Sequence, residues 1–323
     1  MSDVLLDVKD LVIYYETDDG VVQALNGVSL QIFSGKTLGL VGETGAGKTT
    51  LAKGIMQLIP NPPGKIKSGE VWYNGNDLLK KNKEDMRKIR GREISMIFQD
   101  PMTALNPVMT VREQIMEVIL QHNNVNKEEA GKRADHMLEL VGIPAARGKE
   151  YPHQFSGGMK QRVIIAMALA CQPKLLIADE PTTALDVTIQ AQVLDLIQNL
   201  KARDNTSMLL ITHDLGIVAQ ICDYVAIMYA GEIVEYGTVQ EVYKNMKHPY
   251  TKGLMASIPN LVHNVKRLQT IDGLMPDPTC LSKGCKFAER CKFATDACRE
   301  KVPDMVSVGG THTVRCILPE VVG

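Results

Sequence analysis

The stretch "GETGAGKT" at positions 42–49 has the residue types and the spacing that bind a triphosphate. It fits the pattern G-x-x-x-x-G-K-S/T, in which small residues let backbone N–H groups surround a phosphate at the start of a helix. We expect Lys48 to bind the β- and γ-phosphates, Thr49 to give its hydroxyl to Mg²⁺, and Thr50 to reach the α-phosphate. The other predicted loop contacts are Gly42, Thr44, Gly45, Ala46 and Gly47. A glycine turn without a ligand is the weaker alternative, because the motif lies between a strand and a helix.

Two neighbouring carboxylates follow a second apolar segment, "LLIADE". We expect Asp179 to hold Mg²⁺ through water and Glu180 to be the base that deprotonates an attacking water. His213 ends the similar segment "LLITHD" and is a candidate contact to the γ-phosphate. An acidic pair at a strand end can also be merely solvated. The phosphate loop in the same chain favours the catalytic interpretation.

The stretch "QFSGGMKQR" predicts a second anion site. Ser156, Gly157 and Gly158 offer a hydroxyl and bare N–H groups at the start of a predicted helix, 159–170. One polypeptide does not need two such sites for one triphosphate. We therefore expect another subunit's nucleotide to dock against the second site.

The elements that must position these residues alternate between strands and helices. Apolar segments at 38–41, 174–179 and 207–212 predict buried strands, and 188–203 has helical periodicity, which is typical of a parallel sheet covered by helices. Residues 101–155 are predicted mostly helical and form an inserted subdomain. Residues 224–239 predict a hairpin that turns at Ala230-Gly231.

Over about the first 240 residues the motifs resemble the ATP-binding subunit of an ABC transporter. They occur in that family's order: positions 42–49, Gln99 in "IFQD", Ser156 to Met159, Asp179-Glu180, "ALD" at 184–186, and His213. Phe155 and Met159 stand where the commonest signature has Leu and Gln. The resemblance implies an α/β fold: a P-loop NTPase core of ABC type, an inserted helical subdomain and a small Cys-rich C-terminal domain.

The resemblance also implies roles for residues that are uninformative alone. Tyr15, by itself an aromatic in an apolar strand, would stack on adenine. Gln99 would contact Mg²⁺ and the attacking water while its loop senses a permease. Asp186 would communicate across a dimer of ATPase subunits.

The C-terminal cysteines have the spacing C-x5-C-x6-C-x17-C at Cys285, Cys291, Cys298 and Cys316, with Cys280 left over. No tight C-x2-C pair of the kind that grips zinc is present. Wider spacing suits a 4Fe-4S cluster, which we predict as a structural tie for a tail with little core. Zinc is the second alternative, and free or disulfide-bonded thiols are the third.

The segment "HPYTKGLMASIPN" and the cysteine-rich stretch after it are similar to the C-terminal extension of ATPases that serve dipeptide and oligopeptide importers. We therefore expect an ATP-hydrolysing subunit that powers peptide import. The expected domains are 1–247, with a helical subdomain at about 100–165, and 248–323. The implied partners are a second, different ATPase chain, two transmembrane permease subunits and, indirectly, an extracytoplasmic peptide-binding protein.

Charge and composition argue against a nucleic-acid-binding protein and against a membrane-spanning one. The net charge is −1 and no dense basic run is present, so we expect no nucleic-acid partner. The longest apolar run, at 163–171, is short for a membrane span, and the N-terminus lacks a signal pattern, so we expect a peripheral protein at the cytoplasmic face of the membrane. Two rivals remain: a soluble ABC ATPase in DNA repair or translation, and an iron-sulfur regulatory protein that only binds nucleotide.

Overall fold

The computed structural model describes residues 3–99, 104–183, 185–257 and 271–318, and the chain divides into two compact units. One comprises residues 4–32, 37–79 and 211–323 and is here named the phosphate-loop unit. The other comprises residues 1–3, 33–36 and 80–210 and is named the carboxylate unit. The expected domain boundary near residue 247 stays a prediction.

The phosphate-loop unit contains an antiparallel sheet that the sequence did not lead us to expect. Its strand order is β2-β1-β4-β5. Buried side chains of β1 alternate as Leu6 and Val8 and then, after a register shift around Asp10, as Leu11 and Ile13. This period of two explains why the segment folds as a strand. The bounds are β1 Val4–Thr17, β2 Gly20–Phe33, β4 Gly64–Tyr73 and β5 Asn76–Asp77.

The same unit contains strands in the order β11-β12-β10-β9-β3. Strands β3 (Thr37–Val41) and β9 (Tyr224–Tyr229) pair in parallel, as expected of buried apolar strands. The predicted hairpin is confirmed: β10 (Glu232–Thr238) pairs antiparallel with β9, and the turn places Ala230 at φ 43° and Gly231 at φ 78°. Strands β11 (Val306–Gly309) and β12 (His312–Val314) extend this order, and β12 pairs antiparallel with β10.

Helices of this unit include α1, which begins at Lys48 as predicted. The helices are α1 Lys48–Ile55, α8 Leu215–Ile221, α9 Val239–Lys244, α10 Pro249–Ala256 and α11 Asp296–Glu300, with 3-10 turns η1 Leu78–Lys80 (which reaches the first residue of the carboxylate unit) and η4 Ala288–Arg290. Residues 248–257 and 271–318 are here named the tail. The tail packs Tyr250 and Phe287 against Tyr229 of β9, with ring centroids 4.6 and 5.2 Å from that of Tyr229. The tail therefore shares the apolar core of the unit that holds the phosphate loop.

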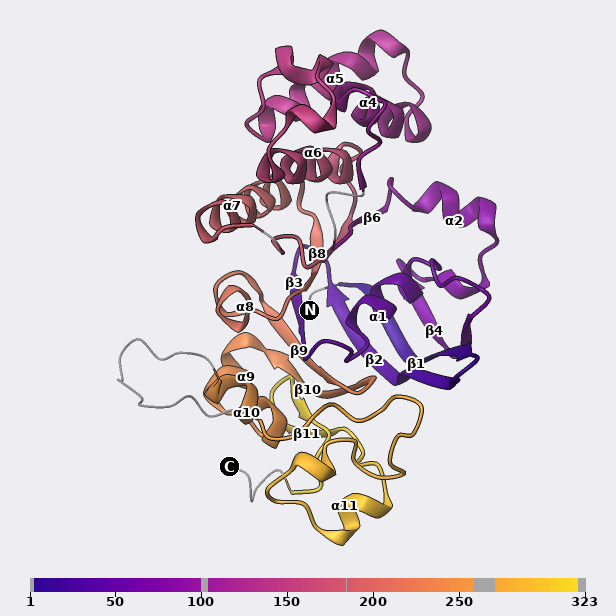
Figure 1. The fold of residues 1–323 in the computed structure, drawn as a ribbon, viewed down its shortest axis with the longest axis vertical. Helices are drawn as coiled ribbons and strands as arrows, with labels where there is room; N and C mark the ends of the chain where they lie inside the picture. Colours follow the sequence, from indigo (N-terminus) through magenta and orange to yellow (C-terminus); the bar gives the residue numbers. More distant parts are fainter. Residues whose placement is uncertain (1–2, 100–103, 184, 258–270, 319–323) are drawn as a thin grey trace. The chain divides into compact units, whose positions relative to one another are not determined.

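The carboxylate unit contains strands in the order β8-β7-β6, with β6 and β7 parallel. Their bounds are β6 Ile94–Ile97, β7 Leu175–Asp179 and β8 Ser207–Ile211. The helices are α2 Lys83–Ile89, α4 Val111–His122, α5 Lys127–Leu140, α6 Gly157–Leu169 and α7 Val187–Asp204, with 3-10 turns η2 Ala145–Lys149 and η3 Pro152–Gln154. Figure 1 shows α4, α5 and α6 side by side, in agreement with the predicted helical character of this region.

Helix starts in this unit are fixed by side-chain caps. Thr110 and Glu113 form a capping box at α4, and Asn126 caps α5 by accepting a hydrogen bond from Glu129. Along the described ranges, no helix is both long and apolar enough to cross a lipid bilayer.

Candidate nucleotide site

The phosphate loop connects β3 to α1 through positions that only glycine fits. Gly45 and Gly47 have φ of +85° and +105°. A Cβ at Gly42 would collide with the Met228 carbonyl oxygen, and one at Gly47 would lie 2.6 Å from the Ala24 carbonyl oxygen. Gly47 caps α1 without a side-chain hydrogen bond, so the first N–H groups of the helix face the loop.

Lys48 is buried and its ammonium lies inside the curve of the loop. Its Nζ donates to the carbonyl oxygens of Gly42 at 2.8 Å and Glu43 at 3.0 Å. The N–H of Ala46 also donates to the Glu43 carbonyl oxygen, at 3.1 Å. Two carbonyl oxygens therefore hold the positive charge of Lys48 at a loop that also presents the first N–H groups of α1, and both kinds of group bind phosphate oxygens.

Three other predicted contacts come from the same unit. The Tyr15 hydroxyl donates to Thr50 Oγ1 at 3.5 Å, so the predicted adenine contact lies beside the first turn of α1. The exposed His213 follows Thr212, whose N–H donates to the Leu40 carbonyl oxygen of β3 at 3.3 Å. Tyr15 thus lies beside the helix that follows the phosphate loop, and the segment of His213 lies beside the strand that leads into the loop.

The carboxylate unit brings together Gln99 and Glu180, which are far apart in sequence. Glu180 Oε2 accepts from Gln99 Nε2 at 3.0 Å and from the Thr183 hydroxyl at 2.9 Å. Asp179 is the buried last residue of β7, and Glu180 follows it at φ 47°. Sequence reasoning missed Thr183, although its place three residues after Glu180 in "EPTT" was a usable signal.

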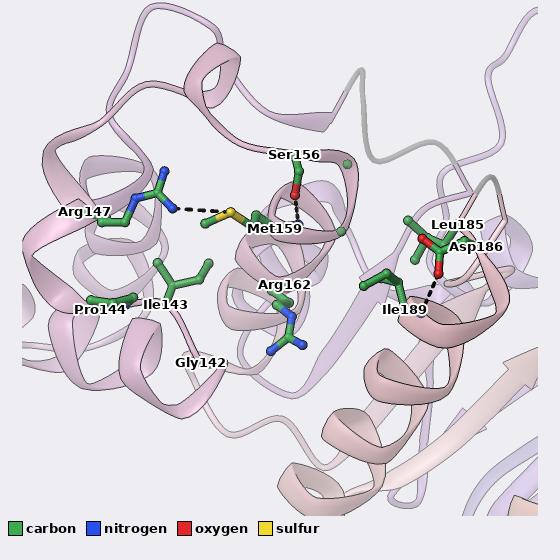
Figure 2. Close-up of a pocket in the computed structure, with 12 residues that line it drawn as sticks. Gly142, Ile143, Pro144, Arg147, Ser156, Met159, Arg162, Leu185, Asp186 and Ile189 are labelled. Carbon is green, nitrogen blue, oxygen red and sulfur yellow. Dashed lines mark hydrogen bonds between the residues drawn. The ribbon is translucent and has the colours of Figure 1, made fainter.

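The predicted second anion site lies at the start of α6, where Ser156 accepts the Met159 N–H at 3.4 Å. Asp186 caps α7 by accepting the Ile189 N–H at 2.9 Å. Figure 2 shows both helix starts bordering one cavity of about 720 Å³. Ala184 of the "ALD" motif lies outside the described residues.

The cavity also contains features that the sequence did not reveal. Arg147 and Arg162 line it, and Arg147 donates to Met159 Sδ at 3.4 Å (Figure 2). Buried Gln161 of α6 donates to the Pro181 carbonyl oxygen at 2.6 Å, which fixes the helix against the segment that follows Glu180. The second anion site and the carboxylates are thus connected within one unit.

Comparisons with known proteins decide the family. Residues 25–183 match the model described as "ABC transporter", and residues 234–298 match "Oligopeptide/dipeptide transporter, C-terminal region". The chain is 53% identical to the oligopeptide transport ATP-binding protein OppD of Bacillus subtilis, over 96% of this chain and 88% of that protein. The chain belongs to the peptide-transporter family of ABC ATP-binding proteins. The predicted family, the predicted fold core and the prediction of an ATPase are confirmed.

Other relatives of this ABC ATPase agree. The dipeptide transport ATP-binding protein DppD of Bacillus subtilis is 48% identical over 98% of this chain and 95% of that protein. A dimeric, post-hydrolysis structure of the ATP-binding cassette MJ0796 with ADP and Pi is 27% identical and covers 72% of this chain and 98% of its own, with a TM-score of 0.65. Neither rival interpretation, a DNA-repair or translation ATPase or an iron-sulfur regulator, gains support.

The predicted iron-sulfur cluster of this ABC ATPase requires correction. Cys285, Cys291, Cys298 and Cys316 line a cavity of about 20 Å³ with apolar neighbours such as Phe287 and Phe293. Among the described residues, no three His, Cys, Asp or Glu side chains are arranged to hold a metal ion. The relatives are named as transport ATP-binding proteins. The prediction of a 4Fe-4S cluster is wrong, and the zinc alternative gains no support.

The physical reason lies in how the thiols are packed. Burial raises the pKa of Cys285 to about 11, and it also raises the pKa values of Cys291 and Cys316. Thiols with raised pKa values stay protonated at neutral pH and pack as small hydrophobic groups. Sequence spacing indicated that the cysteines gather, but it did not indicate the direction and distance of each sulfur.

Proposed function

We propose that this chain hydrolyses ATP to power the import of dipeptides or oligopeptides. The observation that carries the proposal is the 53% identity to an oligopeptide transport ATP-binding protein over 96% of the chain. That range includes the tail, whose family model is described by oligopeptide and dipeptide transport. A phosphate loop with a buried lysine supplies the matching chemistry.

In this proposal the phosphate loop and α1 bind the triphosphate. Lys48 binds the β- and γ-phosphates, and the hydroxyl of Thr50 reaches the α-phosphate. The ring of Tyr15 stacks on adenine. Thr49, Gln99 and Asp179 offer the oxygen donors that suit Mg²⁺.

Glu180 acts as the general base in the proposed mechanism. Two hydrogen bonds, from Gln99 and Thr183, orient its carboxylate, and an oriented carboxylate can accept a proton from an attacking water. His213 contacts the γ-phosphate while the charge on the phosphate oxygens changes during hydrolysis. The water oxygen forms a bond to the γ-phosphorus and the water proton passes to Glu180. The bond between the β–γ bridging oxygen and the γ-phosphorus breaks, and ADP leaves with that oxygen.

We further propose that two ATPase subunits sandwich the nucleotides. The support is the cavity bordered by Ser156 and Asp186, which is large and lined by polar groups at helix starts. The solved MJ0796 cassette is described as a dimer with ADP and Pi. In this arrangement residues 156–158 bind the γ-phosphate held by the partner, and Asp186 contacts the partner subunit.

The proposed complex lies at the cytoplasmic face of the membrane. Two permease subunits receive force from the segment at 99–111, of which residues 100–103 lie outside the described residues. The second ATPase chain is a different polypeptide, and an extracytoplasmic binding protein delivers peptides to the permease.

The test is ATP-dependent peptide uptake. The chain is produced with the permease and ATPase chains encoded beside it, in cells that lack their own peptide importers, and accumulation of labelled dipeptides and oligopeptides is measured. We expect co-purification with the permease chains and uptake that is lost with Lys48→Ala and kept with Lys53→Ala, a lysine in the last turn of the same helix. ATP turnover without permease association or peptide uptake would refute the transport role.

A further inference from the structure

The tail holds the phosphate loop at Glu43, the second residue of the loop. Arg290 Nη1 donates to both carboxylate oxygens of Glu43, at 3.1 Å each. The N–H of Glu43 donates to the Tyr250 hydroxyl at 3.0 Å. Both partners come from the tail, Tyr250 from α10 and Arg290 from η4. One loop residue is therefore bound by two tail side chains, through its backbone and its carboxylate.

Arg290 is itself fixed in place. Its side chain is 7% exposed, compared with 29% for Glu43. Its Nε donates to the Asp272 carbonyl oxygen at 2.9 Å, and Nη1 donates to the Tyr229 hydroxyl at 3.3 Å. The guanidinium also lies 5.8 Å from the Tyr229 ring and 6.0 Å from the Phe287 ring. The position of this positive charge is thus determined by the fold of the tail.

Glu43 connects Arg290 to the lysine that binds phosphate. The carbonyl oxygen of Glu43 accepts from Lys48 Nζ at 3.0 Å and from the Ala46 N–H at 3.1 Å. A shift of Glu43 would therefore displace atoms that surround the ammonium group and an N–H of the loop. The positions of the tail and of Lys48 are linked through one residue.

Charge gives Arg290 a second effect. A carboxylate on a loop that surrounds phosphates repels them, and the repulsion between like charges is appreciable at short range near a protein surface. Arg290 faces Glu43 with two charge-assisted hydrogen bonds and offsets its charge. Without Arg290, the loop would present an uncompensated negative charge to ATP.

We propose that Arg290 is a positioning residue of the ATPase: it anchors Glu43 and neutralises its charge, so that the tail sets the affinity of the phosphate loop for ATP. This inference rests on the proposed binding of the triphosphate at residues 42–49. Arg290 does not contact ATP in this scheme and acts only through Glu43. The tail is therefore part of the nucleotide site's machinery as well as an appendage.

The experiment measures binding of a fluorescent ATP analogue to the full-length chain, and the KM for ATP and kcat of the assembled transporter. We expect Arg290→Ala to weaken binding and raise KM roughly five- to twentyfold, with a smaller change in kcat, because one unit charge is left uncompensated beside the phosphates. Arg290→Lys should recover part of the affinity. Arg299→Ala is the matched control, because this tail arginine is 57% exposed and forms an ion pair with Asp296, a neighbour on α11.

The decisive variant is the double mutant Arg290→Ala with Glu43→Gln. If Arg290 acts through the Glu43 charge, the second substitution should restore affinity to within about twofold of Glu43→Gln alone. The deficit of Arg290→Ala relative to the parent should also shrink at high salt, since ions screen exposed charges. Tail destabilisation alone would predict neither the restoration nor the salt effect.

Two outcomes overturn the inference. One is parental ATP affinity in Arg290→Ala that keeps its fold by circular dichroism. The other is a double variant that binds ATP no more tightly than Arg290→Ala. Should Arg290→Ala fail to fold, Arg290→Lys carries the test, with partial loss that Glu43→Gln reverses as the expected result. Lys48→Ala distinguishes a failure of the proposed triphosphate site from a failure of the role of Arg290. Unchanged ATP affinity in Lys48→Ala would refute the phosphate-loop assignment itself. Lost ATP affinity in Lys48→Ala, together with parental affinity in Arg290→Ala, would refute only the role of Arg290.

Discussion

At the scale of single residues, the proposed role of Glu180 as general base can be tested directly. Glu180→Gln should retain ATP binding within about threefold and lose at least about a hundredfold in steady-state hydrolysis, because the amide keeps the shape but cannot accept the proton. Binding titration and phosphate release measure the two effects. Glu128→Gln is the control, because Glu128 is an exposed carboxylate on α5. Near-parental turnover in Glu180→Gln would exclude its role as the base.

His248 is a second informative residue, because it is buried at the start of α10. Burial lowers the pKa of His248 to about 4, against the partly opposing effect of Glu235. Its Nδ1 accepts the Tyr250 backbone N–H at 3.1 Å, and the backbone N–H of His248 donates to the Glu235 carboxylate at 3.0 Å. The neutral imidazole therefore caps the helix that carries Tyr250 to the phosphate loop.

A pH dependence of stability follows from that pKa. Between about pH 6.5 and pH 4 the unfolded chain binds a proton at His248 and the folded chain does not, so stability is present above this window and falls as pH falls through it. We expect a loss on the order of 3 kcal/mol in the free energy of unfolding across the window. His248→Asn keeps a capping acceptor and should flatten the slope measured by urea unfolding at several pH values. A slope unchanged in His248→Asn would assign the effect to other groups.

At the scale of elements, the start of α6 shows how a helix terminus can serve a second subunit. Ser156→Arg should preserve ATP binding to one subunit and lower hydrolysis by at least about tenfold, because a long side chain would fill the cavity where the partner's phosphate is proposed to bind. Mixtures of parent and variant chains, assayed for turnover, test this. His153→Arg, exposed on the preceding turn, is the control. Full turnover at both sites of a mixed assembly would contradict the role in trans.

At the scale of the whole molecule, apolar packing against β9 holds the tail in place. Cys298 is 8% exposed and belongs to the small cavity that the four cysteines line. Cys298→Ser should lower the free energy of unfolding by about 1–2 kcal/mol, because a more strongly hydrated hydroxyl is moved from water into a cavity with apolar neighbours. The N–H and hydroxyl of Thr295, which lie 3.5 and 3.4 Å from the sulfur, offset only part of this cost. Cys280→Ser should have little effect, since Cys280 is exposed. Equal thermal stability of the two variants would contradict this account of the tail.

The sequence by itself determined the family, the chemistry of the loop and most of the apolar strands. These features depend on short spacings: eight residues of phosphate loop, a buried strand before Asp179, and a hairpin at Ala230-Gly231. Local spacing is readable because the backbone geometry of strands, turns and helix starts repeats over a few residues.

Only the tertiary structure decided which distant residues meet and in what geometry. Gln99 and Glu180 are 81 positions apart, and Glu43 and Arg290 are 247 positions apart. No periodicity connects such pairs, because their contacts depend on strand order and on the packing of the tail. The cysteines show the same limit: their clustering was visible in the sequence, but the direction of each sulfur, and with it the absence of a ligand set among the described residues, depends on how the tail folds.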